Sequence, residues 1–187
     1  MNRFLIITIL VTALICSATS CMKEKLAVTY NNQENKIEQY INSKKYITVD
    51  GEKDSLRVVH NDGANRLILE EGTGEGLDNK GTIAFYYAGY VFNGSKSNAN
   101  LFITNHEDTA RSAGWTLTDE NFSIYQVNMA ETEFIEGLRK GLMGVKAGEH
   151  SEILFSGKYG FGNEPFGIIP VNSALLYEIW VEAVSND

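Results

Sequence analysis

The residue types that most often carry out protein chemistry are sparse and scattered in this sequence of 187 residues. Its histidines, His60, His106 and His150, lie far apart and form no metal-ligand pair. Its two cysteines, Cys16 and Cys21, are too few for a disulfide framework or a four-cysteine zinc site. We therefore expect neither a metal site nor a cofactor.

A glycine-rich run, Gly72–Gly76, superficially resembles a phosphate-binding loop. A phosphate loop of this kind leads into a helix and carries a lysine that contacts the phosphate. Neither a helical pattern nor such a lysine follows the run. We interpret it as a surface turn.

The first twenty residues have the features of an export signal. Arg3 gives a basic start, and the largely apolar stretch Phe4–Cys16 is shorter than a membrane span needs. The small residues from Ala18 to Ser20 run directly into Cys21, which resembles a bacterial lipoprotein cleavage site, although leucine is commoner than Ala18 at its first position. The resemblance implies cleavage before Cys21 and acylation of its thiol and new amino group. The alternative is ordinary secretory cleavage near Ser20 with a free cysteine.

The cysteine count supports lipidation. Cys16 would leave with the signal peptide (residues 1–20), so Cys21 would be the single cysteine of the mature chain, where a free thiol is a liability. Each buried methylene of an acyl chain contributes about 0.8 kcal/mol to membrane anchoring. We therefore expect a lipid-anchored protein of the cell envelope, either periplasmic or at the outer membrane.

Composition and charge bound the remaining possibilities. The sequence is 43% hydrophobic and 21% charged, which is typical of a globular domain. Its formal net charge of −8 provides no basic face for nucleic acid. We expect a monomer that does not bind nucleic acid.

Residues 21–54 are predicted to form an N-terminal extension with one short helix. Asn31 is placed to cap this helix, with Glu34 three residues later as in a capping box. Its narrow apolar face consists of Ile37, Tyr40 and Ile41. The helix is expected to dock on the main domain or to act as a spacer from the membrane.

Residues 55–187 combine strand patterns with one convincing short helix. The helix spans Phe134–Leu142 and has an apolar stripe. The predicted strands are Ser55–His60, Arg66–Glu70, Ile83–Val91, Phe122–Met129, Ser151–Phe155 and Leu175–Val184. Several antiparallel strands around one amphipathic helix indicate an α+β domain.

Two finer predictions concern polar residues. In the turn-rich segment 95–121, Asn105 is expected to cap a short helix that has Glu107 and Asp108 in its first turn. In the last strand, alternation places Tyr177 inward and Glu178 and Glu182 outward.

Three groups of residues carry a family resemblance. They are Tyr86–Gly89; Phe134–Leu142 followed by Gly144–Glu149; and Tyr159–Gly162 followed by Gly167–Pro170 and Ala174–Glu178. In this order they resemble the first core strand, the central helix and turn, and the aromatic-glycine loop and final strand of FK506-binding-protein (FKBP) type peptidyl-prolyl cis-trans isomerases. The resemblance covers residues 57–185 and implies a curved antiparallel β-sheet wrapped around one short helix.

The implied reaction needs little chemical apparatus. Rotation about an X–Pro amide passes through a twisted state in which resonance is lost, against a barrier of about 18–20 kcal/mol. An apolar pocket that binds the proline ring and strips water from the carbonyl can favour the twisted amide. With nine tyrosines and nine phenylalanines, the chain is rich in suitable side chains.

The resemblance also implies which residues form the pocket. The expected catalytic residues are Tyr87, Phe134, Ile135, Leu138, Phe161 and Tyr177. The expected substrate-binding residues are Phe102, Tyr125, Ile168 and Ile169. Leu138 would be the floor, and the backbone N–H of Ile135 would donate to a substrate carbonyl.

The chain departs from the family pattern at three of these places. Leu138 replaces a tryptophan, and Phe161 lacks the hydroxyl of a frequent tyrosine. The family's Phe-Asp pair is aligned here with Phe102-Ile103, which loses the carboxylate; aligning it with Ser97-Asn98 would lose both residues. Together these losses are expected to lower the rate of isomerisation by roughly one to three orders of magnitude.

Two functions remain open from the sequence. One is a membrane-anchored prolyl isomerase that acts on proline-containing polypeptides and assists the folding of exported proteins. The other is a non-catalytic module that uses the same groove to bind a peptide or protein. The retained aromatic residues favour the first, and the lost polar groups favour the second.

Overall fold

The computed structural model describes the backbone of residues 2–49 and 52–186, and the side chains of residues 22–46 and 54–186. It divides into two compact units, residues 1–32 and residues 33–187. The second unit begins before Ser55, the predicted domain boundary, because Ile37, Tyr40 and Ile41 are buried against the sheet. The signal peptide and the thiol of Cys21 lie outside the residues whose side chains are described.

The N-terminal helix is longer than expected. Helix α1 runs from Asn2 to Lys44, so Asn31 lies inside it and is not its N-cap. No glycine or proline occurs before Lys44 to interrupt the helix. Within the described residues, no helix is both long and apolar enough to cross a bilayer.

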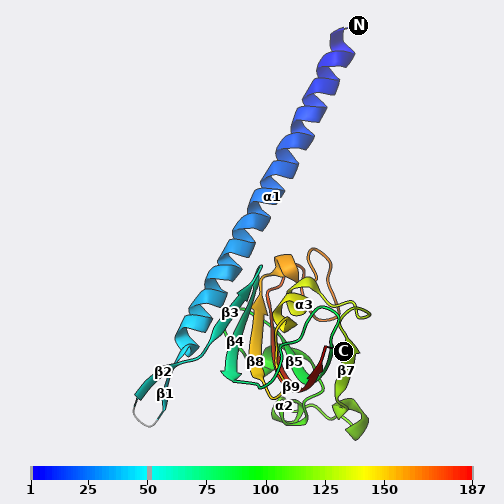
Figure 1. Cartoon of the computed structure of the whole chain (residues 1–187). Helices are drawn as coiled ribbons and strands as arrows, with labels where there is room; N and C mark the ends of the chain where they lie inside the picture. Colours follow the sequence, from blue (N-terminus) through cyan, green and yellow to red (C-terminus); the bar gives the residue numbers. More distant parts are fainter. Residues whose placement is uncertain (1, 50–51, 187) are drawn as a thin grey trace. The chain divides into compact units, whose positions relative to one another are not determined.

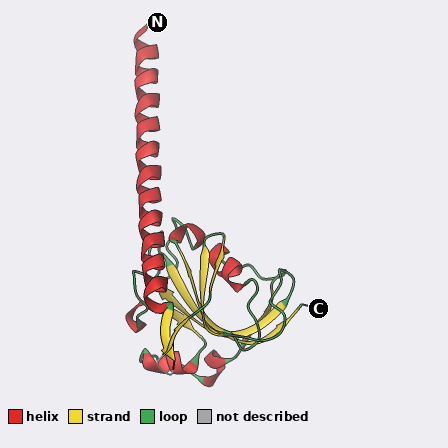
Figure 2. Ribbon diagram, turned by 60° about the vertical axis from the view of Figure 1, so that its left-hand side comes forward, coloured by secondary structure: helices red, strands yellow, loops and turns green. Residues whose placement is uncertain are grey.

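A seven-stranded sheet forms the centre of the second unit and curves around the short helix α3, Glu136–Leu142 (Figures 1 and 2). The strand order is β3-β4-β8-β9-β5-β6, with β7 paired to β5, and every pair is antiparallel. The strands are β3 Val58–Asn61, β4 Ala64–Glu70, β5 Thr82–Val91, β6 Leu101–Thr104, β7 Tyr125–Asn128, β8 His150–Phe155 and β9 Leu175–Ser185. The predicted α+β architecture is confirmed.

Smaller elements complete the unit. A separate hairpin pairs β1, Tyr46–Val49, with β2, Glu52–Ser55. Helix α2 spans Glu107–Ser112, and three 3-10 turns lie at Asn98–Asn100, Asp119–Phe122 and Gly157–Tyr159. The expected cap of α2 is wrong: His106 precedes the helix, and the side chain of Asn105 bonds to other parts of the chain.

Two glycines let α3 pack closely on the sheet. A Cβ atom added at Gly137 would fall on the ring of Phe155, and one at Gly141 would fall on Ile153. Both glycines lie on the side of α3 that faces β8, four residues apart and therefore one above the other. The close approach buries Leu142 completely and leaves Leu138 7% exposed.

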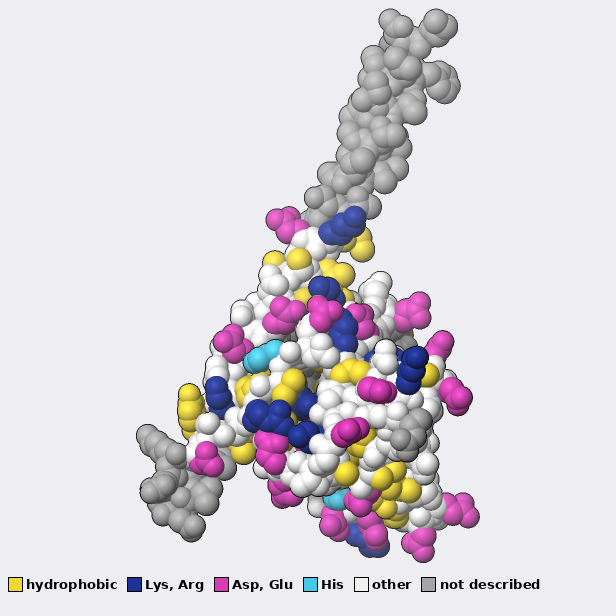
Figure 3. Space-filling view, in the orientation of Figure 1, with side chains coloured by type: hydrophobic (Ala, Val, Ile, Leu, Met, Phe, Trp, Pro, Cys, Tyr) yellow, Lys and Arg dark blue, Asp and Glu magenta, His cyan; other side chains and the backbone are white. Residues whose placement is uncertain are grey.

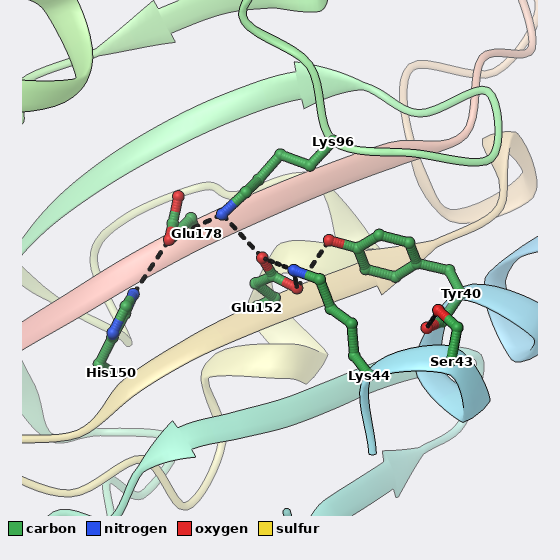
Figure 4. A network of polar contacts seen from close by, with 7 residues as sticks. All are labelled: Tyr40, Ser43, Lys44, Lys96, His150, Glu152 and Glu178. Atoms are coloured by element: carbon green, nitrogen blue, oxygen red, sulfur yellow. Dashed lines mark hydrogen bonds and ion pairs between the residues drawn. The ribbon is translucent and has the colours of Figure 1, made fainter. Parts of the chain in front are cut away.

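The opposite face of the sheet is covered by the last turns of α1 and joined to them by buried charges (Figure 4). Glu152 of β8 is fully buried and contacts Lys44 at 2.9 Å, Lys96 at 2.8 Å and the hydroxyl of Tyr40 at 3.0 Å. Glu178 also lies on this face, as expected, but it is buried rather than exposed, because Lys96 and His150 bond to it.

Candidate active site

An apolar cavity of 160 Å³ lies between the sheet and the start of α3. It is lined by Phe85, Tyr87, Ile103, Tyr125, Phe134, Leu138 and Tyr177. Four strands supply five of these side chains, α3 supplies Leu138, and Phe134 lies in the segment just before α3. The structure thus brings together five of the ten residues predicted for the pocket.

Strand geometry explains why the rings converge. Phe85 and Tyr87 are two residues apart on β5, so both side chains project from the same face of the sheet. The ring of Tyr125, from the neighbouring β7, meets them edge-on at centroid distances of 5.6 Å and 5.8 Å. Phe102 contacts Tyr177 edge-on at 5.8 Å and supports that wall without lining the cavity.

Buried charges hold the helix that provides the cavity floor. The guanidinium of Arg66 donates to the carbonyl oxygens of Gly141 and Met143, each at 2.7 Å, at the end of α3. Arg66 also pairs with Glu149 at 3.1 Å, and both side chains are almost completely buried. These bonds satisfy helix-end carbonyls that have no partner within the helix. They fix the position of Leu138.

Three phenol hydroxyls, those of Tyr87, Tyr125 and Tyr177, are the only polar side-chain groups of the lining. Within the described chain, none of them makes a hydrogen bond. Burial raises the pKa of Tyr177, and the neighbouring Tyr87 adds to the effect. Burial likewise raises the pKa of Tyr87. Both hydroxyls therefore stay protonated at neutral pH and can donate to a carbonyl oxygen.

The predicted backbone donor lies just before α3. The helix begins at Glu136, two residues later than expected, and Ile135 is its N-cap residue with φ −57° and ψ 143°. The first N–H groups of a helix have no intrahelical partner, and the N–H of Ile135 makes no hydrogen bond within the described residues. It therefore remains free for a ligand.

The aromatic-glycine loop does not reach the cavity lining. Phe161 is half-buried and stacks on Phe166 with a centroid distance of 4.5 Å. Ile168 is 75% exposed, whereas Ile169 is 2% exposed and packs in the core. The roles assigned to Phe161, Ile168 and Ile169 stay predictions.

Two lining residues were absent from the predicted site. Phe85 belongs to the predicted strand Ile83–Val91, and its spacing of two from Tyr87 is the signal that places it on the same face. Ile103 aligns with the family's aspartate, and its place in the lining favours that alignment over Ser97-Asn98. Ser97 instead caps a 3-10 turn.

A larger hollow of 470 Å³ lies elsewhere, between residues 34–45 of the chain and the hairpin of β3 and β4. Its walls include Ile37, Ile41, Val58 and Tyr159, together with several charged side chains. It contains none of the residues predicted for the pocket. Size alone therefore does not identify the site.

Comparisons with known proteins agree with the geometry. A family model described as FKBP-type peptidyl-prolyl cis-trans isomerase matches residues 77–182. FK506-binding protein 1 of Aspergillus oryzae is 28% identical over 117 residues, which are 63% of this chain and 94% of that protein. FK506-binding protein 1 of Yarrowia lipolytica is 26% identical over 113 residues, which are 59% of this chain and 88% of that protein.

Solved structures show the same fold. FkpA from Escherichia coli has a TM-score of 0.52 and 17% identity, with 96% of this chain and 71% of that chain covered. The N-terminal domain of FKBP42 from Arabidopsis thaliana has a TM-score of 0.52 and 16% identity, with 75% of this chain and 100% of that chain covered.

Proposed function

Since this chain belongs to the family of FKBP-type peptidyl-prolyl cis-trans isomerases, we propose that its aromatic cavity binds the proline ring of a polypeptide and catalyses rotation of the preceding peptide bond. The observation that carries the proposal is the convergence of Tyr87, Tyr125, Phe134, Leu138 and Tyr177 on one apolar cavity. Rotation about the bond transfers no proton or group, so the site needs no acid, base or nucleophile.

The cavity offers two means of lowering the barrier. Its apolar walls remove water from the X–Pro carbonyl, whose hydration favours the planar, resonance-stabilised amide. The N–H of Ile135 and the phenol hydroxyls supply donors to carbonyl oxygens of the bound chain. Donors that bind the twisted amide better than the planar one accelerate the reaction.

We propose further that the protein is exported and anchored to the membrane of a cell envelope by acylation of Cys21, where it assists the folding of exported proteins. The support is the run of small residues before Cys21 and the loss of Cys16 with the signal peptide. Cys21→Ser should release the protein from membranes. Equal retention of wild type and variant after a high-salt wash would contradict the anchor.

The second candidate function is a peptide-binding module without catalysis. Ile103 favours it, because it lines the cavity at the place aligned with the family's carboxylate. A module of this kind would bind proline peptides at the same cavity without accelerating their isomerisation.

Ile135→Pro tests the backbone donor assigned to catalysis. Proline fixes φ near −65°, close to the −57° of Ile135, and removes the N–H. We expect this variant to lose about tenfold in kcat/KM in a protease-coupled proline-peptide assay, the equivalent of one hydrogen bond.

Ile135→Ala is the matched control, since it keeps the N–H and removes only packing. A wild-type protein that binds the peptide without accelerating isomerisation would establish the binding module. A folded Ile135→Pro variant with full activity would show that the donor is misassigned.

A further inference from the structure

A second cavity lies on the opposite face of β5 from the aromatic cavity proposed to bind proline, which is called the prolyl cavity below. Successive residues of a strand point to opposite faces: Tyr87 of β5 lines the prolyl cavity, and Tyr86 lines a hollow of 310 Å³ on the other side. The structure therefore contains two cavities that share β5 and no lining residue.

Aromatic rings form one side of this hollow. His106 stacks on Trp180 with a centroid distance of 3.9 Å and an interplanar angle of 9°. Tyr86 meets His106 edge-on at 6.3 Å, and Phe122 adds a further ring from the 3-10 turn at Asp119–Phe122. All four rings are half-buried, so each keeps part of its surface exposed to solvent. His150 also stacks on Trp180, at a centroid distance of 5.0 Å.

The charges around the hollow are negative. Its lining includes the carboxylates of Glu107, Asp108 and Glu182 and contains no lysine or arginine. Arg111 neutralises Glu107, but Asp108 and Glu182 make no ion pair or hydrogen bond within the described residues. Figure 3 shows acidic side chains gathered over the end of the molecule that carries α2. Two carboxylates are therefore unpaired beside an aromatic wall.

Histidine does not cancel this charge. Burial lowers the pKa of His106, against the opposing effect of Asp108, so the ring is neutral at neutral pH. Its Nδ1 lies 2.9 Å from the hydroxyl of Thr109, which holds the ring in its stacked position. The hollow combines a neutral aromatic wall with a net negative rim.

We propose that this hollow binds the guanidinium group of an arginine side chain in a polypeptide. A guanidinium is planar and weakly hydrated, stacks on aromatic faces and bonds to carboxylates with a fork of donors. An ammonium is more compact and more strongly hydrated, and it matches this combination less well. The partner is thus a basic segment of a protein, recognised independently of any proline.

The test follows the indole N–H of Trp180 by NMR while the full chain is titrated with N-acetyl-arginine N-methylamide. Trp115 is an internal reference, because it lies outside the hollow. The matched neutral ligand is the citrulline analogue, which has the same shape without the charge. We expect a saturable shift of Trp180 with arginine and at least about tenfold weaker binding of citrulline, as is typical when a charge-assisted contact is lost.

Variants locate the site. Asp108→Asn and Glu182→Gln each remove one charge from an exposed side chain and should weaken arginine binding by about three- to tenfold. Glu75→Gln removes an exposed charge outside the hollow and should change nothing. The lysine analogue should bind more weakly than arginine.

Three results would overturn the proposal: equal binding of the arginine and citrulline analogues, an equal effect of Glu75→Gln, or equal binding of the lysine and arginine analogues. The last would mean that the hollow attracts any cation by charge alone. None of these readouts depends on isomerase activity, so failure of the proposed function would leave the test intact.

Discussion

The side-chain oxygen of Asn105 accepts a hydrogen bond of 2.6 Å from the backbone N–H of Tyr87. The backbone N–H of Asn105 donates in return to the carbonyl of Tyr87 at 3.2 Å, and its side-chain amide donates to Ser123 at 3.1 Å. Asn105 is 6% exposed. One buried carboxamide therefore fixes the part of β5 from which the wall of the prolyl cavity projects.

Asn105→Ala should lower both stability and activity. The substitution leaves the N–H of Tyr87 without its side-chain partner inside the protein, which costs about 1–3 kcal/mol. We expect this loss in chemical denaturation, together with a reduced kcat/KM because the ring of Tyr87 is no longer held in place. Asn98→Ala is the control, since it removes an exposed bond to Ser112 and should change the free energy of unfolding by less than about 0.5 kcal/mol. Equal effects of the two substitutions would contradict the role of Asn105.

The buried carboxylate of Glu178 should make stability depend on acid pH. Burial alone would raise the pKa of Glu178, but the hydrogen bond from His150 and the charge of Lys96 outweigh it and hold the pKa below the usual 4.5. A carboxyl group with a lowered pKa in the folded state stabilises the protein above its unfolded-state pKa. This contribution is lost as the pH falls below about 4.5 and through the folded-state pKa.

Glu178→Gln should therefore reduce stability at pH 7 by about 1.5–3 kcal/mol and flatten the fall in unfolding free energy between about pH 5 and pH 3. The measurement is urea denaturation across this pH range. Glu182→Gln, at an exposed position on the same strand, should retain the wild-type slope. An unchanged slope in Glu178→Gln would show that other groups cause the acid dependence.

Local patterns were sufficient for much of the fold. Alternation along β5 and β9 placed Tyr87 and Tyr177 on the face that forms the cavity, and the apolar stripe of α3 placed Leu138 there. These features depend on residues close in sequence, so a period of two or of 3.6 reveals them. The antiparallel pair of β3 and β4 corresponds to the strands predicted at Ser55–His60 and Arg66–Glu70.

Features that depend on contacts distant in sequence were missed. Asparagine is a common helix-capping residue. The side chain of Asn105 nevertheless bonds to the backbone of Tyr87, eighteen residues away on β5. Glu178 alternates outward as predicted, but it is buried there with Lys96 and His150 bonded to it. Ile103 enters the lining through the pairing of β6 with β5, whose register shifts between Gly89 and Tyr90. No local pattern encodes such pairings.

Ile103→Asp should strengthen binding of a proline peptide. Ile103 lines the cavity and is 40% exposed, so a carboxylate there would keep contact with water and fold without a large penalty. An additional charged acceptor for a substrate N–H is worth about 1.5–3 kcal/mol, or more than about tenfold in affinity. Ile103→Asn is the matched control, with similar shape and no charge, and should gain less. Weaker binding by both variants would indicate that the aliphatic side chain itself contacts the ligand.

The last prediction concerns Phe161, whose family counterpart often carries a hydroxyl. The ring is half-buried and stacks on Phe166, so the added oxygen of Phe161→Tyr can reach water at the loop surface. We therefore expect stability within about 0.5 kcal/mol of wild type.

If the loop covers the pocket when a peptide binds, the new hydroxyl should add one neutral hydrogen bond, worth about 1 kcal/mol or roughly fivefold in affinity. Thermal unfolding and proline-peptide titration should be measured on the same samples. Phe166→Tyr, in the exposed partner ring, is the control and should leave affinity unchanged. A Phe161→Tyr variant that is destabilised and binds as wild type would remove Phe161 from the site, because its hydroxyl would then lie unsatisfied in the protein interior.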